Sequence, residues 1–238
     1  MENRYDTIVW GSSPRGIARA IALKNCGKKV LLASRFGFPG GKHTESLAAF
    51  FGLIPSHEDS LEQKLVSQAA GMHFGILHHS TTGLLLHPET IKRICWQWIN
   101  EAGIPVLFHV LPAGTVRNGR ELTVKFFGRE GYFSLTAESI EDYSDNIPLP
   151  GIEPNRHYNM IIHAFFSNPL PLSVSGFNLV RNINTSIGPF VSLSVRRVAG
   201  SELDTTFNRE LNRLSIEGWS KYRSRIRMIP VYPEISPA

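Results

Sequence analysis

Residues 6–35, DTIVWGSSPRGIARAIALKNCGKKVLLASR, decide the fold of this chain. The apolar run 7–10 predicts a strand buried on both faces. Apolar residues then recur at helical spacing over 15–25, and Gly27 suits the position just past a helix C-terminus. Residues 29–33 predict a second strand. Strand, glycine turn, helix and strand in this order predict a right-handed βαβ unit, with the turn at the carboxyl edge of a parallel sheet.

The turn after the first strand is Gly11-Ser12-Ser13-Pro14-Arg15-Gly16. In a dinucleotide-binding turn the first glycine permits the bend, the second admits the diphosphate, and the third lets helix pack on strand. Gly11 and Gly16 hold the first and third positions, whereas Ser13 replaces the second glycine. Its Cβ crowds the approach, although its hydroxyl can donate to a phosphate. All six residues are candidate contacts of a diphosphate at the positive end of the helix.

The second strand ends in Ser34 and Arg35, where a dinucleotide site normally places an acid that binds the ribose hydroxyls. Two interpretations remain open. A small residue followed by arginine suits a ribose 2′-phosphate and would favour NADP. Alternatively, the ribose acceptor has been lost and the site is weakened.

The remaining sequence predicts a first region with helices and a hairpin, and a second region rich in strands. Gly128-Arg129-Glu130-Gly131 is typical of a hairpin turn. Helices are expected over 58–70, 88–102 and from Asp204 or Thr205 onward, and strands over 104–110, 122–127, 132–136, 157–166 and 189–198.

The loop Phe36-Gly37-Phe38-Pro39-Gly40-Gly41 is the most specific motif in the chain. With the βαβ unit before it, this loop resembles the N-terminal segment of FAD-dependent oxidoreductases of the glutathione-reductase superfamily. The resemblance extends over residues 5–235 and implies a β-meander over 122–136, followed by a substrate-domain sheet and long helix. It also implies that the flavin is approached by Gly40, Gly41, Lys42 and His43, and that the adenine lies near Val110.

The chain departs from this family beyond Ser13 and Ser34. The family expects Asp-x-Thr-Gly-Asp at a strand end near residue 142, where this chain has Asp142-Tyr143-Ser144-Asp145-Asn146. The family also continues into a C-terminal segment that completes the cofactor pocket, so the chain resembles a truncated member. We therefore expect a partner, either a second copy of the chain or another subunit, to complete the site.

Composition excludes several other classes of protein. The net charge of +5 includes no long basic run, so no nucleic-acid partner is expected. No apolar segment is long enough to span a membrane. The N-terminus lacks the features of a signal peptide. The two cysteines lie far apart in sequence and form no CxxC motif, so we expect free thiols and a cytoplasmic protein. The nine histidines show no metal-ligand spacing, so no metal site is expected.

The sequence thus predicts an α/β fold: a Rossmann-like parallel sheet with helices, of the FAD/NAD(P)-binding type, plus a β-meander and a smaller α+β substrate-type lobe. The expected domains are 1–150 and 151–238. The expected function is FAD-dependent hydride transfer between the flavin and a small organic substrate. The alternatives are a non-catalytic relative without cofactor, serving as a binding or structural subunit, and an NADP-binding protein. No catalytic residue is assigned.

Overall fold

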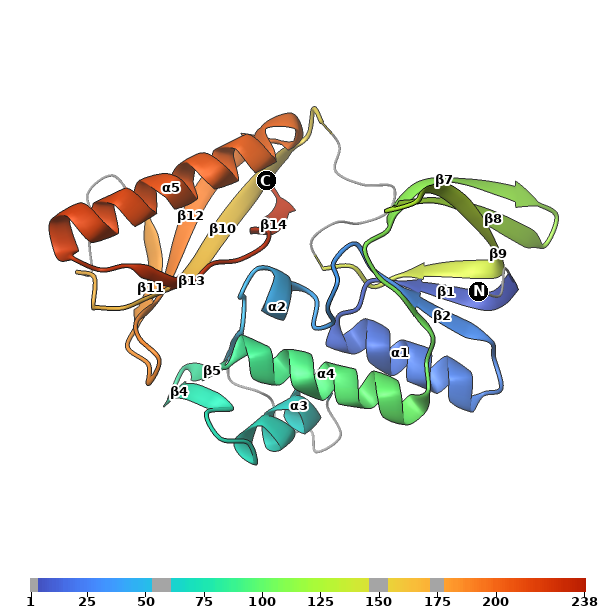
Figure 1. Cartoon of the computed structure of the whole chain (residues 1–238), viewed down its shortest axis with the longest axis horizontal. Helices are drawn as coiled ribbons and strands as arrows, with labels where there is room; N and C mark the ends of the chain where they lie inside the picture. Colours follow the sequence, from blue (N-terminus) through green and yellow to red (C-terminus); the bar gives the residue numbers. More distant parts are fainter. Residues whose placement is uncertain (1–3, 53–60, 146–153, 172–177) are drawn as a thin grey trace. The chain divides into compact units, whose positions relative to one another are not determined.

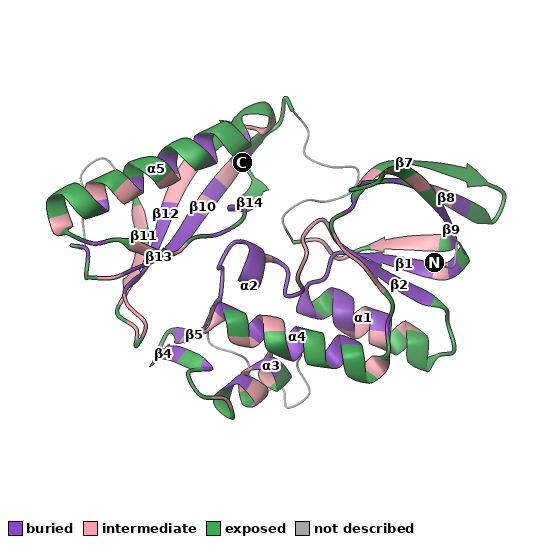
Figure 2. Ribbon diagram, in the orientation of Figure 1, coloured by how far each residue is buried: buried purple, intermediate pink, exposed green. Residues whose placement is uncertain are grey.

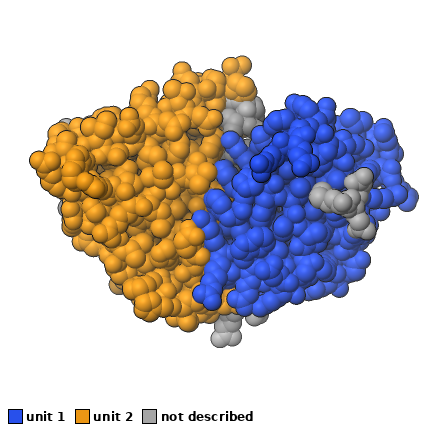
Figure 3. All heavy atoms as spheres, viewed as in Figure 1, with its two compact units in different colours: residues 1–41, 59–65, 91–151 blue, residues 42–58, 66–90, 152–238 orange. Residues whose placement is uncertain are grey.

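The computed structural model describes residues 4–52, 61–145, 154–171 and 178–238. The chain forms two compact units, coloured separately in Figure 3, and each is assembled from three segments. Unit 1 consists of 1–41, 59–65 and 91–151, and unit 2 of 42–58, 66–90 and 152–238.

This division differs from the one expected at residues 150/151, a point that itself lies outside the described residues. Residues 42–52 and 66–90 fall inside the expected first domain, whereas the structure groups them with the C-terminal half in unit 2. Chain order alone cannot reveal this grouping, because it depends on packing between segments that are far apart in sequence.

Unit 1 is built on one six-stranded sheet in the order β6-β2-β1-β9-β8-β7 (Figure 1). In chain order its strands are β1 (Arg4–Trp10), β2 (Val30–Ala33), β6 (Val106–Leu107), β7 (Leu111–Asn118), β8 (Glu121–Gly128) and β9 (Gly131–Asp142). β2 and β9 flank β1 in parallel, and β6 extends the parallel part beyond β2. β8 and β7 add an antiparallel meander. The predicted Rossmann-like sheet with a β-meander is confirmed.

Helix α1 (Pro14–Asn25) joins β1 to β2 and begins in the glycine turn. Ser13 is its N-cap: the backbone there is extended, and the Ser13 Oγ accepts a hydrogen bond from the Gly16 N–H at 3.3 Å. Pro14 stands in the first turn, where its missing N–H removes no helical hydrogen bond. The helix ends at Asn25, and Gly27 follows with φ +78°, as the sequence predicts.

Burial explains why β1 and β2 form the centre of the sheet. All four residues of β2 are buried, as are residues 7–10 of β1 (Figure 2). Trp10, Leu31 and Phe126 belong to one apolar cluster of unit 1. Each such side chain contributes about 1.5–3 kcal/mol on burial. The apolar runs in the sequence therefore specify the two strands that position the glycine turn.

Two parts of unit 1 differ from the sequence expectation. The strand expected over 104–110 is reduced to Val106–Leu107, because Pro105 precedes it and His109 has a left-handed backbone with φ +58°. β7 was not expected, because its sequence shows no alternation of apolar and polar residues. The structure explains this, since seven of its eight residues are exposed and need not be apolar.

Unit 2 contains two antiparallel sheets. The larger has the order β11-β12-β10-β13, with β14 also paired to β10; the smaller has the order β3-β5-β4. The strands are β3 (Phe50–Gly52), β4 (Ile76–Ser80), β5 (Gly83–Leu86), β10 (His157–Phe166), β11 (Leu179–Ile183), β12 (Phe190–Ala199), β13 (Ile226–Met228) and β14 (Glu234–Pro237). β10 and β12 correspond to the two strands expected in the second region.

Helix α5 (Leu203–Tyr222) covers the larger sheet of unit 2 (Figure 1). Its Leu203 and Phe207 pack in one cluster with Met160 and Leu193 from the sheet. The remaining helices are α2 (Lys42–Glu45), α3 (Leu61–Ala70), α4 (Pro88–Ala102) and the 3-10 turn η1 (Gly200–Glu202). Residues 58–60 of the expected 58–70 helix lie outside the described residues.

Candidate functional site

The glycine turn forms the centre of the candidate site in unit 1. Gly11 has φ +102°, a conformation that glycine adopts without strain. A Cβ on Gly16 would collide with the carbonyl oxygen of Gly11 and approach the Tyr143 Cβ at 3.0 Å. The two glycines therefore serve the roles predicted for the first and third positions: one makes the bend, and the other lets α1 pack on β1.

Ser13, at the position of the second glycine, uses its hydroxyl in two hydrogen bonds. The Ser13 Oγ donates to the Tyr143 carbonyl at 2.9 Å while it accepts from the Gly16 N–H. Ser13 is 3% exposed and the neighbouring Ser12 only 1%. Pro14 is also buried, whereas Arg15 is exposed and pairs with Glu62 at 3.5 Å. The Ser13 hydroxyl thus ties the turn to the segment after β9.

The loop ending in Gly40 and Gly41 packs directly on this turn. The Gly40 N–H donates to the Ser12 carbonyl at 2.8 Å. A Cβ on Gly41 would meet the Asp145 Oδ2 and would lie 2.7 Å from the Ser13 Cβ. Gly41 has φ +56°, so backbone geometry and space both require glycine here. The structure thus brings together the loop, the turn and the carboxylate of Asp145.

The end of β2 has a buried serine and a half-buried arginine. Ser34 is 2% exposed and accepts a hydrogen bond from the Ser12 Oγ at 3.2 Å. Its N–H donates to the Leu107 carbonyl at 2.9 Å, and its carbonyl accepts from the Val110 N–H at 3.3 Å. Ser34 therefore links neighbouring segments inside unit 1. At this end of β2, Arg35 is the side chain that remains partly exposed.

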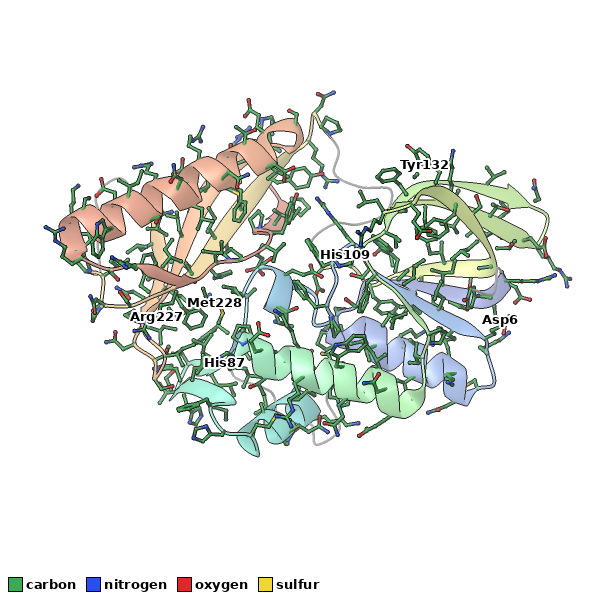
Figure 4. The ribbon with its side chains drawn as sticks, in the orientation of Figure 1. Asp6, His87, His109, Tyr132, Arg227 and Met228 are labelled. Atoms are coloured by element: carbon green, nitrogen blue, oxygen red, sulfur yellow. The ribbon has the colours of Figure 1, made fainter. Side chains whose placement is uncertain are left out.

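A hollow of about 960 Å³ lies beside this end of β2. It lies next to both Arg35 and Val110, two residues that the sequence analysis singled out separately. The other lining residues are Leu107, Phe108, His109, Leu111, Phe127, Gly128, Arg129, Glu130 and Phe133. Figure 4 labels His109, which lines the hollow, and Tyr132, which lies at the start of β9 next to the lining residue Phe133. Aromatic walls with a few polar groups are typical of sites that bind a purine base.

Sequence reasoning missed most of this lining. Arg129 and Glu130 were interpreted only as turn residues. The aromatic residues of β8 and β9 stand in adjacent pairs, one on each face of the sheet, so the sequence does not show which member of a pair borders a hollow. The left-handed backbone of His109, which is rare for a residue other than glycine, was not detectable in the sequence.

Lys42 and His43 lie in unit 2, each with a partner there. The Lys42 Nζ pairs with the Glu234 Oε1 at 2.9 Å. The His43 Nδ1 is 2.7 Å from the Ala48 carbonyl oxygen, and its ring stacks on Phe51 with centroids 4.7 Å apart. The two residues expected near the flavin are therefore held by unit 2.

Glu234 continues into a polar network inside unit 2 that the sequence analysis did not identify. Its Oε2 is 3.1 Å from the His163 Nε2, and the His163 Nδ1 is 2.8 Å from the Ser192 Oγ. Burial by itself would raise the pKa of Glu234, but the hydrogen bond from His163 and the charge of Lys42 lower it to about 2. The one available signal in the sequence was a histidine, His163, inside the largely apolar strand β10 (His157–Phe166).

This Ser-His-Glu arrangement is not a hydrolase site. Ser192 is 0% exposed and His163 only 2%, so no substrate carbonyl can reach the serine oxygen. Ser192 and His163 are also paired residues of β12 and β10, which fixes their contact as part of the sheet. The network acts instead as a structural link between Lys42 and the larger sheet of unit 2.

The described residues contain neither a cluster of metal ligands nor a membrane-spanning helix. Across 4–52, 61–145, 154–171 and 178–238, no group of three or more His, Cys, Asp or Glu side chains could hold a metal ion. In the same part of the chain, none of the helices combines the length and apolarity needed to cross a membrane.

Comparison with known families agrees with the geometry of the turn. Residues 6–146 match the family described as FAD dependent oxidoreductase. The chain belongs to this family. The match includes the turn, the Gly40-Gly41 loop, the meander and Asp145. No curated protein sequence matches the chain.

Solved structures of two hydroxylases and a monooxygenase share the fold of this family member at low sequence identity. The OxyS anhydrotetracycline hydroxylase from Streptomyces rimosus is 15% identical, with a TM-score of 0.60 over 95% of this chain and 51% of its own. CabE, an aromatic hydroxylase from angucycline biosynthesis, is 15% identical, with a TM-score of 0.58 over 98% and 52%. The p-nitrophenol 4-monooxygenase PnpA from Pseudomonas putida DLL-E4 is 12% identical, with a TM-score of 0.58 over 100% and 68%. The chain spans about half the length of the first two.

The described residues of unit 1 fit the adenosine end of FAD better than its diphosphate. The hollow beside Arg35 and Val110 has the size and aromatic lining for an adenine and ribose. The positive end of α1 is correctly placed after β1. Asp145, however, puts a carboxylate against Gly41, at the loop that approaches the diphosphate in the family.

Proposed function

We propose that this chain is the nucleotide-binding part of an FAD-dependent oxidoreductase that acts on a small organic substrate. The observation that carries the proposal is the hollow of about 960 Å³ next to both Arg35 and Val110, at the carboxyl end of β2. Ligands of doubly wound sheets bind at this edge. Family membership over residues 6–146 supports FAD as the ligand.

In this proposal each part of unit 1 has one task. The hollow binds the adenosine end, and Arg35 lies beside the ribose. Gly11 and Gly16 keep the N-terminus of α1 close to the diphosphate. Bound FAD would supply hydride transfer, a chemistry that protein side chains lack.

The test is a titration of the purified chain with FAD, followed by gel filtration and an absorbance spectrum. We expect the protein fraction to retain a band near about 450 nm, where oxidised flavin absorbs. Arg35→Ala should weaken retention, whereas Arg117→Ala on β7, outside the hollow, should leave it unchanged. A fraction that stays colourless after prolonged incubation with excess FAD would rule the proposal out.

A second candidate function is a non-catalytic relative that kept the fold after losing its cofactor. The contact of Asp145 with Gly41 favours it, because a fixed negative charge there opposes a diphosphate. The NADP alternative is favoured only by Arg35 beside a buried Ser34. Comparing ADP with its 2′-phosphorylated counterpart separates it, since only an NADP site prefers the extra phosphate.

A further inference from the structure

Two departures from the family pattern meet at a single point in unit 1. Ser13 stands where the family has its second glycine, and Asp145 where the strand-end motif has its glycine. A Cβ on Gly41 would touch both of them, the Asp145 Oδ2 on one side and the Ser13 Cβ at 2.7 Å on the other. The substituted positions are 132 residues apart in sequence, yet they border the same few atoms.

The segment that bears Asp145 is held firmly against the turn. The Tyr143 N–H donates to the Trp10 carbonyl at 2.7 Å, and the Tyr143 carbonyl accepts from the Ser13 Oγ at 2.9 Å. The Ser144 N–H donates to the Asp142 Oδ1 at 2.9 Å. Because these bonds hold the backbone of residues 143 and 144 against the end of β1 and the turn, they place the next residue, Asp145, near Gly41.

The charge of this carboxylate has the wrong sign for the family's ligand. The N-terminus of α1 carries a partial positive charge that attracts anions. A carboxylate beside it offsets that attraction and repels a diphosphate, and the repulsion is screened by salt because Asp145 is exposed. The adenosine hollow is lined by other residues, so an uncharged adenosine should not sense Asp145.

We propose that Asp145 is a specificity-determining residue that lowers the affinity of this site for dinucleotide diphosphates. The inference rests on the proposed function, since it assumes that FAD or a related nucleotide binds at this edge of the sheet. Ser13 adds steric crowding at the same point, so the two substitutions act together on the diphosphate and leave the adenosine end unchanged.

The experiment measures dissociation constants for FAD, ADP and adenosine by calorimetry, at low and high salt. Asp145→Asn removes the charge and keeps the shape, while Asp145→Gly restores the family residue. Glu138→Gln on β9, the strand that precedes the Asp145 segment, is the control, because it removes an equal charge from a side chain that is 57% exposed and does not line the hollow. We expect both Asp145 variants to bind FAD and ADP about tenfold more tightly at low salt, with a smaller gain at high salt. Adenosine affinity should stay the same.

Each result separates the inference from the proposed function. If Asp145→Asn binds ADP and FAD no more tightly than the parent chain does, the inference is wrong. If both proteins also bind FAD tightly, the proposed function still stands. FAD binding by the variant alone supports the inference and identifies the parent chain as the non-catalytic relative. If no form binds FAD or ADP, both ideas are wrong. A gain that Glu138→Gln reproduces would also overturn the inference, since net charge alone would explain it.

Discussion

Glu234 is held between a cation and a buried histidine, and this position makes its ionisation depend on the fold. The carboxylate is paired with Lys42 at 2.9 Å and His163 at 3.1 Å, and its side chain is 24% exposed. A partly buried charge is tolerated only when its partners remain in place, so the loss of one partner is costly. The network therefore fixes α2 to the larger sheet of unit 2.

The first prediction concerns the pH dependence of this network. The pKa of Glu234 falls from 4.5 to about 2 on folding, so its stabilising contribution is complete above pH 4.5 and is lost as the pH falls toward 2. Glu234→Gln should lower the free energy of unfolding at pH 7 by about 2 kcal/mol. The difference between parent and variant should shrink between pH 4.5 and 2.

Urea unfolding of both proteins at several pH values measures this difference directly. Glu202→Gln is a suitable control, since Glu202 is exposed and lies outside the network. A gap between parent and Glu234→Gln that stays constant from pH 7 to pH 3 would contradict the assignment.

Individual residues of the site were predictable to different degrees. Gly11 and Gly16 could be assigned from the sequence because their roles are local, a bend and a close helix–strand contact. The contact between Asp145 and Gly41 could not, because it depends on how β9 pairs with β1. Ser34 was placed correctly at the end of β2, but its burial and its bond to Ser12 required the structure.

At the scale of the elements, the packing of α1 on β1 depends on Gly16. We predict that Gly16→Ala lowers the free energy of unfolding by about 1–3 kcal/mol, because the added methyl group meets the Gly11 carbonyl. Gly52→Ala in β3 is the matched control, since a Cβ there meets nothing within 4 Å. Thermal unfolding of the two variants provides the measurement, and equal melting temperatures would refute the packing argument.

The sequence predicted long and buried elements better than short or exposed ones. β1, β2, α1, α4, β10 and β12 have strong apolar patterns, which burial explains. β3, β13 and β14 have only three or four residues each, too few for a periodicity to stand out. Their positions are set by pairing partners distant in sequence, such as Glu234 with Ile161 on β10.

For the whole molecule, the two units are each assembled from segments that alternate along the chain. Residues 42–58 and 66–90 belong to unit 2 although residues on both sides of them belong to unit 1. Composition and chain order gave a boundary near residue 150 but no indication of this alternation. A family pattern identified the Gly40-Gly41 loop, but only the structure shows that Lys42, the next residue, belongs to unit 2 and pairs with Glu234 there.

The last prediction uses ligand binding to the intact chain. A ligand that binds only the folded state raises the melting temperature, by an amount equivalent to about 2.7 kcal/mol at a concentration of 100 times its dissociation constant. Because the hollow in unit 1 lies at the adenosine end of the site, ADP and FAD should stabilise the chain, whereas FMN, which lacks adenosine, should not. Arg35→Ala should reduce the shift caused by ADP, and Arg117→Ala should leave it unchanged. Thermal shift assays across a ligand series measure these effects, and stabilisation by FMN equal to that by FAD would mean that the flavin end, and not the adenosine hollow, provides the binding energy.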